Sequence, residues 1–235
     1  MILYDIQFNG KTGISVGVIV QSRPNIPTAE KIYETIDIPG RDGVLYRDTG
    51  TVKDIKIEVS LAFREQDPDT WMEKFRAVKK WLLSSANNKL SFTDDQNYFY
   101  RVKKVVIGNA ERIVKRQGKM TVAFWCEGYM YLQIGTKEQQ ISVLLNNPGE
   151  RCWPVYKIAG EGMCTVTING KQIKANVGQN LTIDTERKLA YRTDGTMQNT
   201  SISGNYEDMT LNPGKNSISV TGGFVLTAIP NWRCY

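Results

Sequence analysis

The chain has 235 residues, of which 41% are hydrophobic and 23% are charged, as is typical of a globular protein with a buried core. This length suits two medium-sized domains better than one. No run of 18 apolar residues occurs, so we expect no membrane-spanning helix. The formal net charge is +6: 20 basic and 16 acidic residues precede Gly135, while 10 basic and 8 acidic residues follow it. Neither half therefore has the concentrated charge of a basic arm.

The chain contains no histidine, so the usual general base and the commonest metal ligand are both missing. The four cysteines, Cys126, Cys152, Cys164 and Cys234, lack the spacing of a zinc site. Residues 1–5 show neither the basic region nor the apolar stretch of a secretory signal, so we expect free thiols and synthesis in the cytoplasm. We predict no metal, no cofactor and no enzymatic activity.

Three turn signals separate apolar, strand-like segments in the first 45 residues: Phe8-Asn9-Gly10, Arg23-Pro24-Asn25-Ile26-Pro27 and Pro39-Gly40-Arg41-Asp42-Gly43. We expect strands at 2–8, 14–20 (with a bulge or close contact at Gly17), 31–38 and 51–64. The last two are predicted to form the longest strand pair. Charged and apolar residues alternate from Lys53 to Leu61, which indicates a sheet with one wet face.

A helix is predicted over residues 68–85. Asp67 is a good N-cap and Pro68 suits the first helical position. An apolar stripe then recurs at steps of four, three and four: Trp71, Phe75, Val78 and Leu82. We expect this stripe to face the core and the helix to cover an open end or face of the sheet. Strands should resume at 90–93, 98–107 and 119–127.

The pattern changes at about Gly135, where turn signals begin to arrive every eight to twelve residues and no helical stripe appears. Residues 165–173 form the clearest hairpin. Such punctuation is typical of a sandwich or jelly roll. We therefore predict a mainly β fold in two domains. An N-terminal β-sandwich with one helix covers residues 1–134. A C-terminal β-sandwich or jelly roll, similar to galectins or carbohydrate-binding modules, covers residues 135–235.

Few side chains suggest chemistry, and each has a structural alternative. The basic groups Arg101, Lys103, Lys104 and Arg112, Lys115, Arg116, Lys119 could face solvent or contact a polyanion. Asp184 and Glu186 could share one face of a strand as an acid/base pair, or could simply mark the end of a hairpin. Asp94-Asp95 fits a turn.

The order of these signals resembles the N-terminal part of the distal tail proteins (the Dit family) of phages with long, non-contractile tails. The resemblance continues through the following segments: Trp81-Leu82, 89–95, Phe124-Trp125-Cys126 with Tyr129, 146–149, Pro154, 166–170, 181–184 and 213–216.

This resemblance implies a structural virion protein at the phage tail tip, forming a hexameric ring that joins the tail tube to the tip or baseplate. Its implied partners are the tail tube protein, the tail-tip and tape-measure proteins, and the receptor-binding proteins. DNA would pass through the lumen without specific binding, and no membrane would be involved.

The loop Pro39-Gly40-Arg41-Asp42-Gly43 is either a plain hairpin tip or, as the resemblance implies, part of a subunit contact or of the ring lumen. Arg41 and Asp42 of neighbouring copies could pair there, so that reversing one charge would be disruptive. An alternative function is carbohydrate binding to host cell-wall polysaccharide. Trp153, Tyr191 and Tyr206 are the candidates for glycan contact, although aromatic residues of a small domain more often fill its core.

Overall fold

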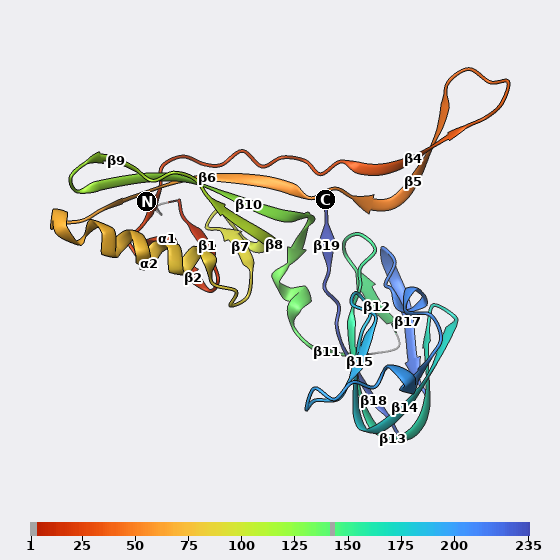
Figure 1. Cartoon of the computed structure of the whole chain (residues 1–235). Coiled ribbons are helices and arrows are strands. Elements are labelled where there is room, and N and C mark those ends of the chain that lie inside the picture. The colour runs from red at the N-terminus through yellow and green to blue at the C-terminus, as the bar shows by residue number, and fades with distance from the viewer. Residues whose placement is uncertain (1–3, 142–143) are drawn as a thin grey trace. The chain divides into compact units, whose positions relative to one another are not determined.

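The structure is a computed structural model that describes residues 4–141 and 144–235. It divides into two compact units, Met1–Met130 with Tyr235, and Tyr131–Cys234. The boundary predicted between residues 134 and 135 falls four residues after this division. Strands dominate both units (Figure 1), so the predicted mainly β fold is confirmed.

The N-terminal unit contains a large curled sheet, a separate hairpin and one long helix. The sheet has the order β2-β1-β7-β8-β10-β6-β3, with β9 also paired to β10, while β4 and β5 pair only with each other. The bounds are β1 (Ile6–Phe8), β2 (Lys11–Thr12), α1 (Gly13–Val16), β3 (Ile19–Val20), β4 (Lys31–Asp37), β5 (Val44–Val52), β6 (Ile55–Arg64), η1 (Pro68–Thr70), α2 (Trp71–Leu83), β7 (Lys89–Phe92), β8 (Asp95–Ile107), β9 (Glu111–Val114) and β10 (Gln117–Leu132).

The sheet curls because its two terminal strands, β2 and β3, are joined by a short segment containing α1. One face of the sheet is lined by alternate residues of the long strands. Ile57 and Val59 of β6 lie opposite Phe124 and Val122 of β10, and all four side chains are fully buried. This is the one-sided burial that the alternation from Lys53 to Leu61 predicted.

The strand predicted at residues 14–20 is wrong in its first half, which forms helix α1. The Thr12 hydroxyl oxygen accepts from the Ser15 N–H (3.2 Å) and caps the helix start. Gly17 ends the helix with φ of 76°, and its N–H donates to the Ile14 carbonyl (2.9 Å). Only residues 19–20 remain as strand β3.

The predicted pairing of residues 31–38 with 51–64 is also wrong. β4 pairs instead with β5, from Asp37 opposite Val44 to Lys31 opposite Val52. β6 pairs with β10 on one side and with β3 on the other. The tight turn at residues 38–43 gives β4 a nearer partner along the chain, and a short loop costs less closure entropy than a long one. Of the opening strand predicted at 2–8, residues 2 and 3 lie outside the described residues.

Helix α2 follows the predicted signals closely, although its first turn is the 3-10 helix η1. The Asp67 carboxylate accepts from the Asp69 N–H (2.9 Å), and Pro68 occupies the first position. Trp71, Val78 and Leu82 are buried in the core as predicted. The α-helix itself ends at Leu83 rather than at residue 85. Figure 1 shows α2 lying along the curled sheet.

The Asn9-Gly10 turn between β1 and β2 holds the C-terminal end of α2. The Trp81 indole N–H donates to the Phe8 carbonyl (2.9 Å) within the core. The Asn9 amide donates to the Ser84 carbonyl (2.7 Å), and its oxygen accepts from the Asn88 N–H (2.9 Å). A turn residue thus satisfies the polar groups that the helix end leaves open.

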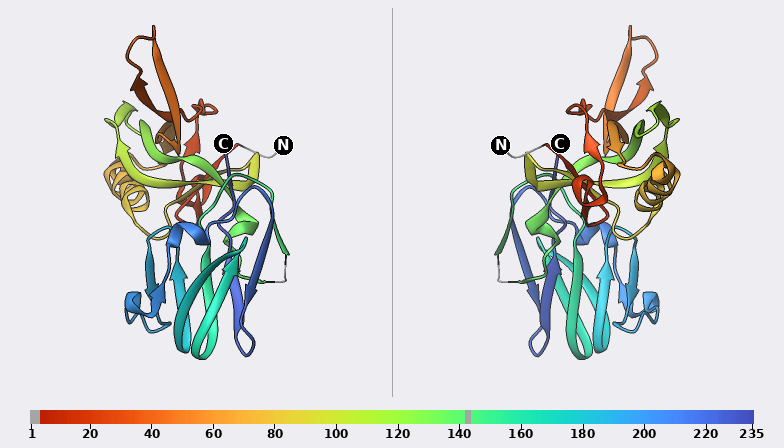
Figure 2. Two further views of the ribbon diagram at one scale, coloured as in Figure 1. Left: turned by 90° about the vertical axis from the view of Figure 1, so that its right-hand side faces the viewer. Right: turned by 90° about the vertical axis from the view of Figure 1, so that its left-hand side faces the viewer.

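The C-terminal unit is a β-sandwich built around one long hairpin, β13–β14, which turns at Asn169-Gly170. Figure 2 shows this hairpin in green and cyan. The bounds are η2 (Gln133–Thr136), β11 (Gln139–Gln140), β12 (Leu144–Asn147), β13 (Val155–Ile168), β14 (Lys171–Asp184), β15 (Leu189–Tyr191), η3 (Asn199–Ser201), β16 (Ile202–Ser203), η4 (Tyr206–Met209), β17 (Gly214–Val220), β18 (Val225–Ile229) and β19 (Arg233–Cys234).

The two layers of the sandwich share this hairpin because β13 changes partner along its length. Residues 155–159 of β13 pair with β18, whereas residues 166–168 pair with β17, which in turn pairs with β12. The core between the layers holds Tyr156, Val166, Ile183 and Leu211, all fully buried. The predicted C-terminal sandwich and the hairpin around residues 165–173 are therefore confirmed.

Two neighbouring leucines of α2 test whether the apolar stripe stabilises the N-terminal unit. Leu82 is completely buried, whereas Leu83 is 63% exposed. We expect Leu82→Ala to lower the free energy of unfolding by about 2–5 kcal/mol, because it removes buried methyl groups and leaves a cavity. Leu83→Ala should change it by less than about 0.5 kcal/mol. Urea titrations followed by tryptophan fluorescence measure both, and equal losses would contradict the packing described.

Candidate assembly interface

Strands β4 and β5 form an isolated two-stranded ribbon whose tip is the predicted loop Pro39-Gly40-Arg41-Asp42-Gly43. The Arg41 N–H donates to the Ile38 carbonyl (3.2 Å) and closes the loop. Gly40 and Gly43 have φ of 79° and 78°, which side chains rarely adopt. A Cβ atom at either glycine would meet nothing within 4 Å, so the tip is bare on all sides.

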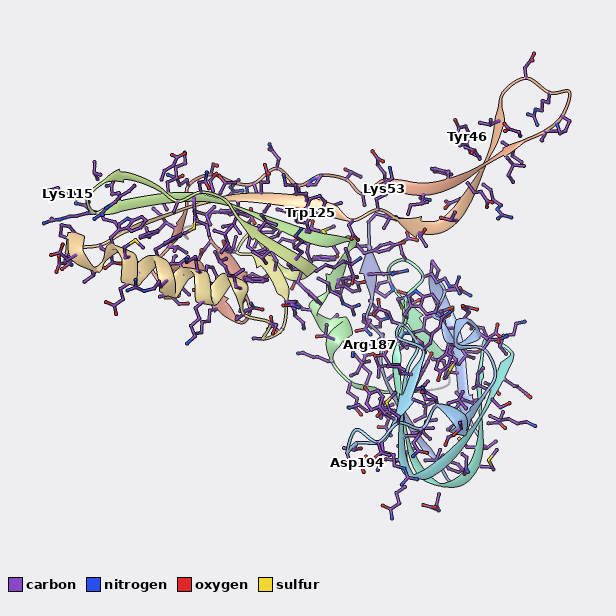
Figure 3. All side chains as sticks on the ribbon, in the orientation of Figure 1. Tyr46, Lys53, Lys115, Trp125, Arg187 and Asp194 are labelled. Carbon is purple, nitrogen blue, oxygen red and sulfur yellow. The ribbon has the colours of Figure 1, made fainter. Side chains whose placement is uncertain are left out.

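Almost the whole of this hairpin is open to solvent, including its large apolar side chains. All residues of β4 and β5 are exposed except Ile36 and Val52, which are half-buried. Tyr46 is the most exposed of the apolar residues at 65% (Figure 3). Its neighbours Tyr33, Leu45 and Val44 are also exposed. An isolated two-stranded hairpin is at best marginally stable in water, and contiguous exposed apolar groups mark a contact surface.

Two ion pairs join strands β4 and β5 of the hairpin, and neither involves a charged residue of the tip. Lys31 pairs with Asp48 (3.2 Å), and Arg47 pairs with Glu34. The Gly50 N–H and Lys31 lower the pKa of the Asp48 carboxyl. Over the described residues, Asp37, Arg41 and Asp42 make no ion pair within the chain, so these three side chains are available to a partner at the tip.

An apolar groove of about 570 Å³ opens on the same unit, where α1 and β3 meet the ends of β6 and β10. Its walls include the buried side chains of Val18 and Phe63, and its rim carries Ile14 and Ile19, which are 51% and 50% exposed. The lining residues are Ile14, Gly17, Val18, Ile19, Gln21, Ala62, Phe63, Arg64, Gln117 and Gly118. The sequence did not predict this groove, because three segments far apart along the chain contribute to it.

The edge of the groove is positively charged. Arg64 and the nearby Arg116 are exposed and form no ion pair with any described residue. The neighbouring Glu65 lies 3.6 Å from Lys74, so its charge is already compensated. The Glu65 N–H also donates to the Arg116 carbonyl (2.9 Å), which holds Arg116 at the same end of the sheet as Arg64.

The three candidate glycan contacts, Trp153, Tyr191 and Tyr206, lie in different segments of the C-terminal unit. The Arg151 guanidinium covers the half-buried Trp153 ring, 5.3 Å from its centroid. The Tyr206 hydroxyl is buried and has no hydrogen-bond partner. Tyr191 ends strand β15 and pairs with Thr182. Glycan contact by these three residues stays a prediction.

Three of the seven predicted basic residues, Arg101, Lys103 and Arg112, have side-chain partners within the chain. Lys103 pairs with Asp54 (2.7 Å), and Arg101 lies 4.0 Å from Glu127. Arg112 stacks over the Trp71 ring at 5.2 Å.

Asp184, at the end of β14, accepts from the Arg187 N–H (3.0 Å), as expected of a residue that ends a hairpin. Asp94 pairs with Arg23 (2.9 Å), and Asp95 begins β8.

No cluster of three potential ligands that could hold a metal occurs in the described part of the chain. Cys126, Cys152 and Cys164 are buried free thiols. Burial raises the pKa of Cys126 and of Cys152 to about 12, so neither is poised as a nucleophile. Among residues 4–141 and 144–235, no helix is long and apolar enough to cross a membrane.

The chain folds into two mainly β units, and comparison with known proteins shows what it resembles. Residues 12–126 match the model of the family described as phage tail protein RIFT-related domain. This segment, which carries both the hairpin and the groove, belongs to that family. No curated protein matches the sequence.

The structure is also similar to the crystal structure of the Dit protein (gp 19.1) of phage SPP1. That protein is described as a paradigm of the hub adsorption apparatus in phages infecting Gram-positive bacteria. The match covers 97% of this chain and 98% of that chain, with a TM-score of 0.69 and 13% sequence identity. The resemblance to distal tail proteins that the sequence predicted is confirmed.

The buried thiols give a direct test of the two cores. At pH 8, iodoacetamide should leave Cys126 and Cys152 unlabelled in the folded protein and label both in urea, as measured by mass spectrometry of peptides. Their pKa is raised above the ordinary 9.0. The stability that they contribute is therefore complete below about pH 9 and is lost as the pH rises toward 12. If iodoacetamide labelled Cys126 or Cys152 in the folded protein as fast as a solvent-exposed thiol, this burial would be contradicted.

Proposed function

We propose that this phage tail protein is one subunit of a hexameric ring at the distal end of the tail. The ring joins the tail tube to the tail tip or baseplate and to the receptor-binding proteins. DNA passes through its lumen without specific binding. The protein acts mechanically, without cofactor or catalysis.

The exposed β4–β5 hairpin is the observation that carries this proposal. A chain that stayed alone would leave Tyr33, Leu45 and Tyr46 in water on a ribbon that pairs with no other strand. Burial of such side chains is worth about 25 cal/mol for each Å² removed from water. Tyrosines surrounded by polar residues are typical anchors of protein interfaces. The hairpin is therefore a surface made to be covered by another subunit.

Ring closure follows from the kind of contact that a hairpin makes. A projecting arm that binds a different surface on an identical neighbour forms a heterologous interface, and such interfaces produce rings when the rotation closes. The number six and the partners above and below the ring come from the likeness to distal tail proteins. The Pro39–Gly43 loop, at the tip of the arm, belongs in this subunit contact.

Tyr46→Glu tests this function without disturbing the core, because the side chain is 65% exposed. Native mass spectrometry of the unchanged protein should show a species of six copies, about 160 kDa from 26.6 kDa each. Loss of an aromatic anchor costs about 2 kcal/mol or more. Tyr46→Glu should therefore raise the concentration at which the ring half-dissociates by about 30-fold.

Met163→Glu is the matched control, since Met163 is as exposed as Tyr46 but lies in the C-terminal unit. It should leave the six-copy species intact. A protein that stays monomeric at micromolar concentration, alone and in the presence of cognate tail proteins, would refute the ring.

A further inference from the structure

The hairpin and the apolar groove lie at opposite ends of strand β6. β5 ends at Val52, two residues before β6 begins at Ile55, and this root lies against Gly128 of β10. The groove takes residues 62–64 from the other end of the same strand. A ten-residue strand spans about 33 Å. Within one copy, most of the length of β6 therefore separates the root of the hairpin from the groove.

We propose that the groove is the receptor for the β4–β5 hairpin of the next copy in the ring. This assignment rests on the proposed ring and names the two surfaces that meet in it. A heterologous contact needs two different, complementary surfaces on each subunit. Surfaces at the two ends of one strand meet this requirement, because each copy can receive a hairpin at one end and donate its own at the other.

Shape and polarity match between the two surfaces. The rings of Tyr33 and Tyr46 lie edge to face with centroids 6.3 Å apart and form an apolar knob on one face of the hairpin. The groove offers the side chains of Val18 and Phe63 as its floor and Ile14 and Ile19 as its rim. Docking of this face would therefore cover Tyr33, Val44 and Tyr46 of the hairpin, together with the exposed rim of the groove, in one contact.

Charge also favours this pairing over other occupants. The hairpin tip presents two carboxylates, Asp37 and Asp42, against the single cation Arg41, and all three lack an ion-pair partner among the described residues. The groove edge presents Arg64 and Arg116, which equally lack one. Complementary charges at the edge of an interface speed association and fix its register.

A second copy of the chain explains both surfaces more economically than the other candidates. The chain's own hairpin would have to reverse direction after Val52 and return along β6, yet β5 forms no ladder with β6 in the described structure. A peptide from another protein would fill the groove but leave the hairpin uncovered.

Mixed cross-linking of two singly substituted full-length chains tests the assignment. One chain carries Tyr46→Cys and the other Ile19→Cys, both in a Cys234→Ser background because the remaining cysteines are buried. A short bismaleimide should join one copy of each into a dimer. A partner carrying Leu83→Cys in place of Ile19→Cys is the control: that residue is as open to solvent but lies outside the groove. It should give at least about tenfold less product.

The outcomes separate this assignment from the ring itself, because native mass spectrometry of the same proteins reports the assembly independently. Six-copy assemblies in which the Ile19 and Leu83 positions cross-link equally would leave the ring standing and overturn the groove as receptor. A third chain carries both Tyr46→Cys and Ile19→Cys. If it cross-links only within itself, the groove holds the hairpin of the same copy, and the assignment to a neighbouring copy is overturned. A monomer that never assembles would remove both proposals.

Discussion

One constraint organises the structure: the β4–β5 ribbon pairs with no other strand and carries apolar side chains that its own chain leaves in water. In the rest of the N-terminal unit, the curled sheet and α2 enclose a continuous core. An uncovered ribbon beside a well-packed sheet is the observation on which the proposed assembly rests. The uncovered ribbon is consistent with the family match of residues 12–126, because a phage tail protein must bind neighbouring subunits.

The C-terminal unit has a different character. Its sandwich carries no comparable arm, and the strands at the ends of its path, β11 and β15, are only two and three residues long. Short edges discourage further strand pairing. The covering of the Trp153 ring by Arg151 and the burial of the Tyr206 hydroxyl fit aromatic residues that serve the fold. Both proposed assembly surfaces thus lie on the N-terminal unit.

The sequence predicted those features whose signals are local. Asp67, Pro68 and the stripe from Trp71 to Leu82 located α2, and alternation located β6. Prediction from the sequence failed where an element was too short to show a period, or where the residues that meet are distant along the chain. Four residues of α1 cannot display a helical period, although the Thr12 cap and Gly17 were visible. The groove could not be predicted, because Val18 and Phe63 meet only when the sheet curls. The hairpin tip was found, but the strand that pairs with β4 was not.

The central claim is that identical subunits close into a ring by covering one another's hairpins. Electron cryomicroscopy of the purified protein, alone and mixed with cognate tail proteins, tests it most directly. The account predicts an annulus of six copies in which each β4–β5 ribbon lies against the adjacent subunit with Tyr46 buried. Particles that never close, or closed rings whose hairpins project into solvent, would contradict it.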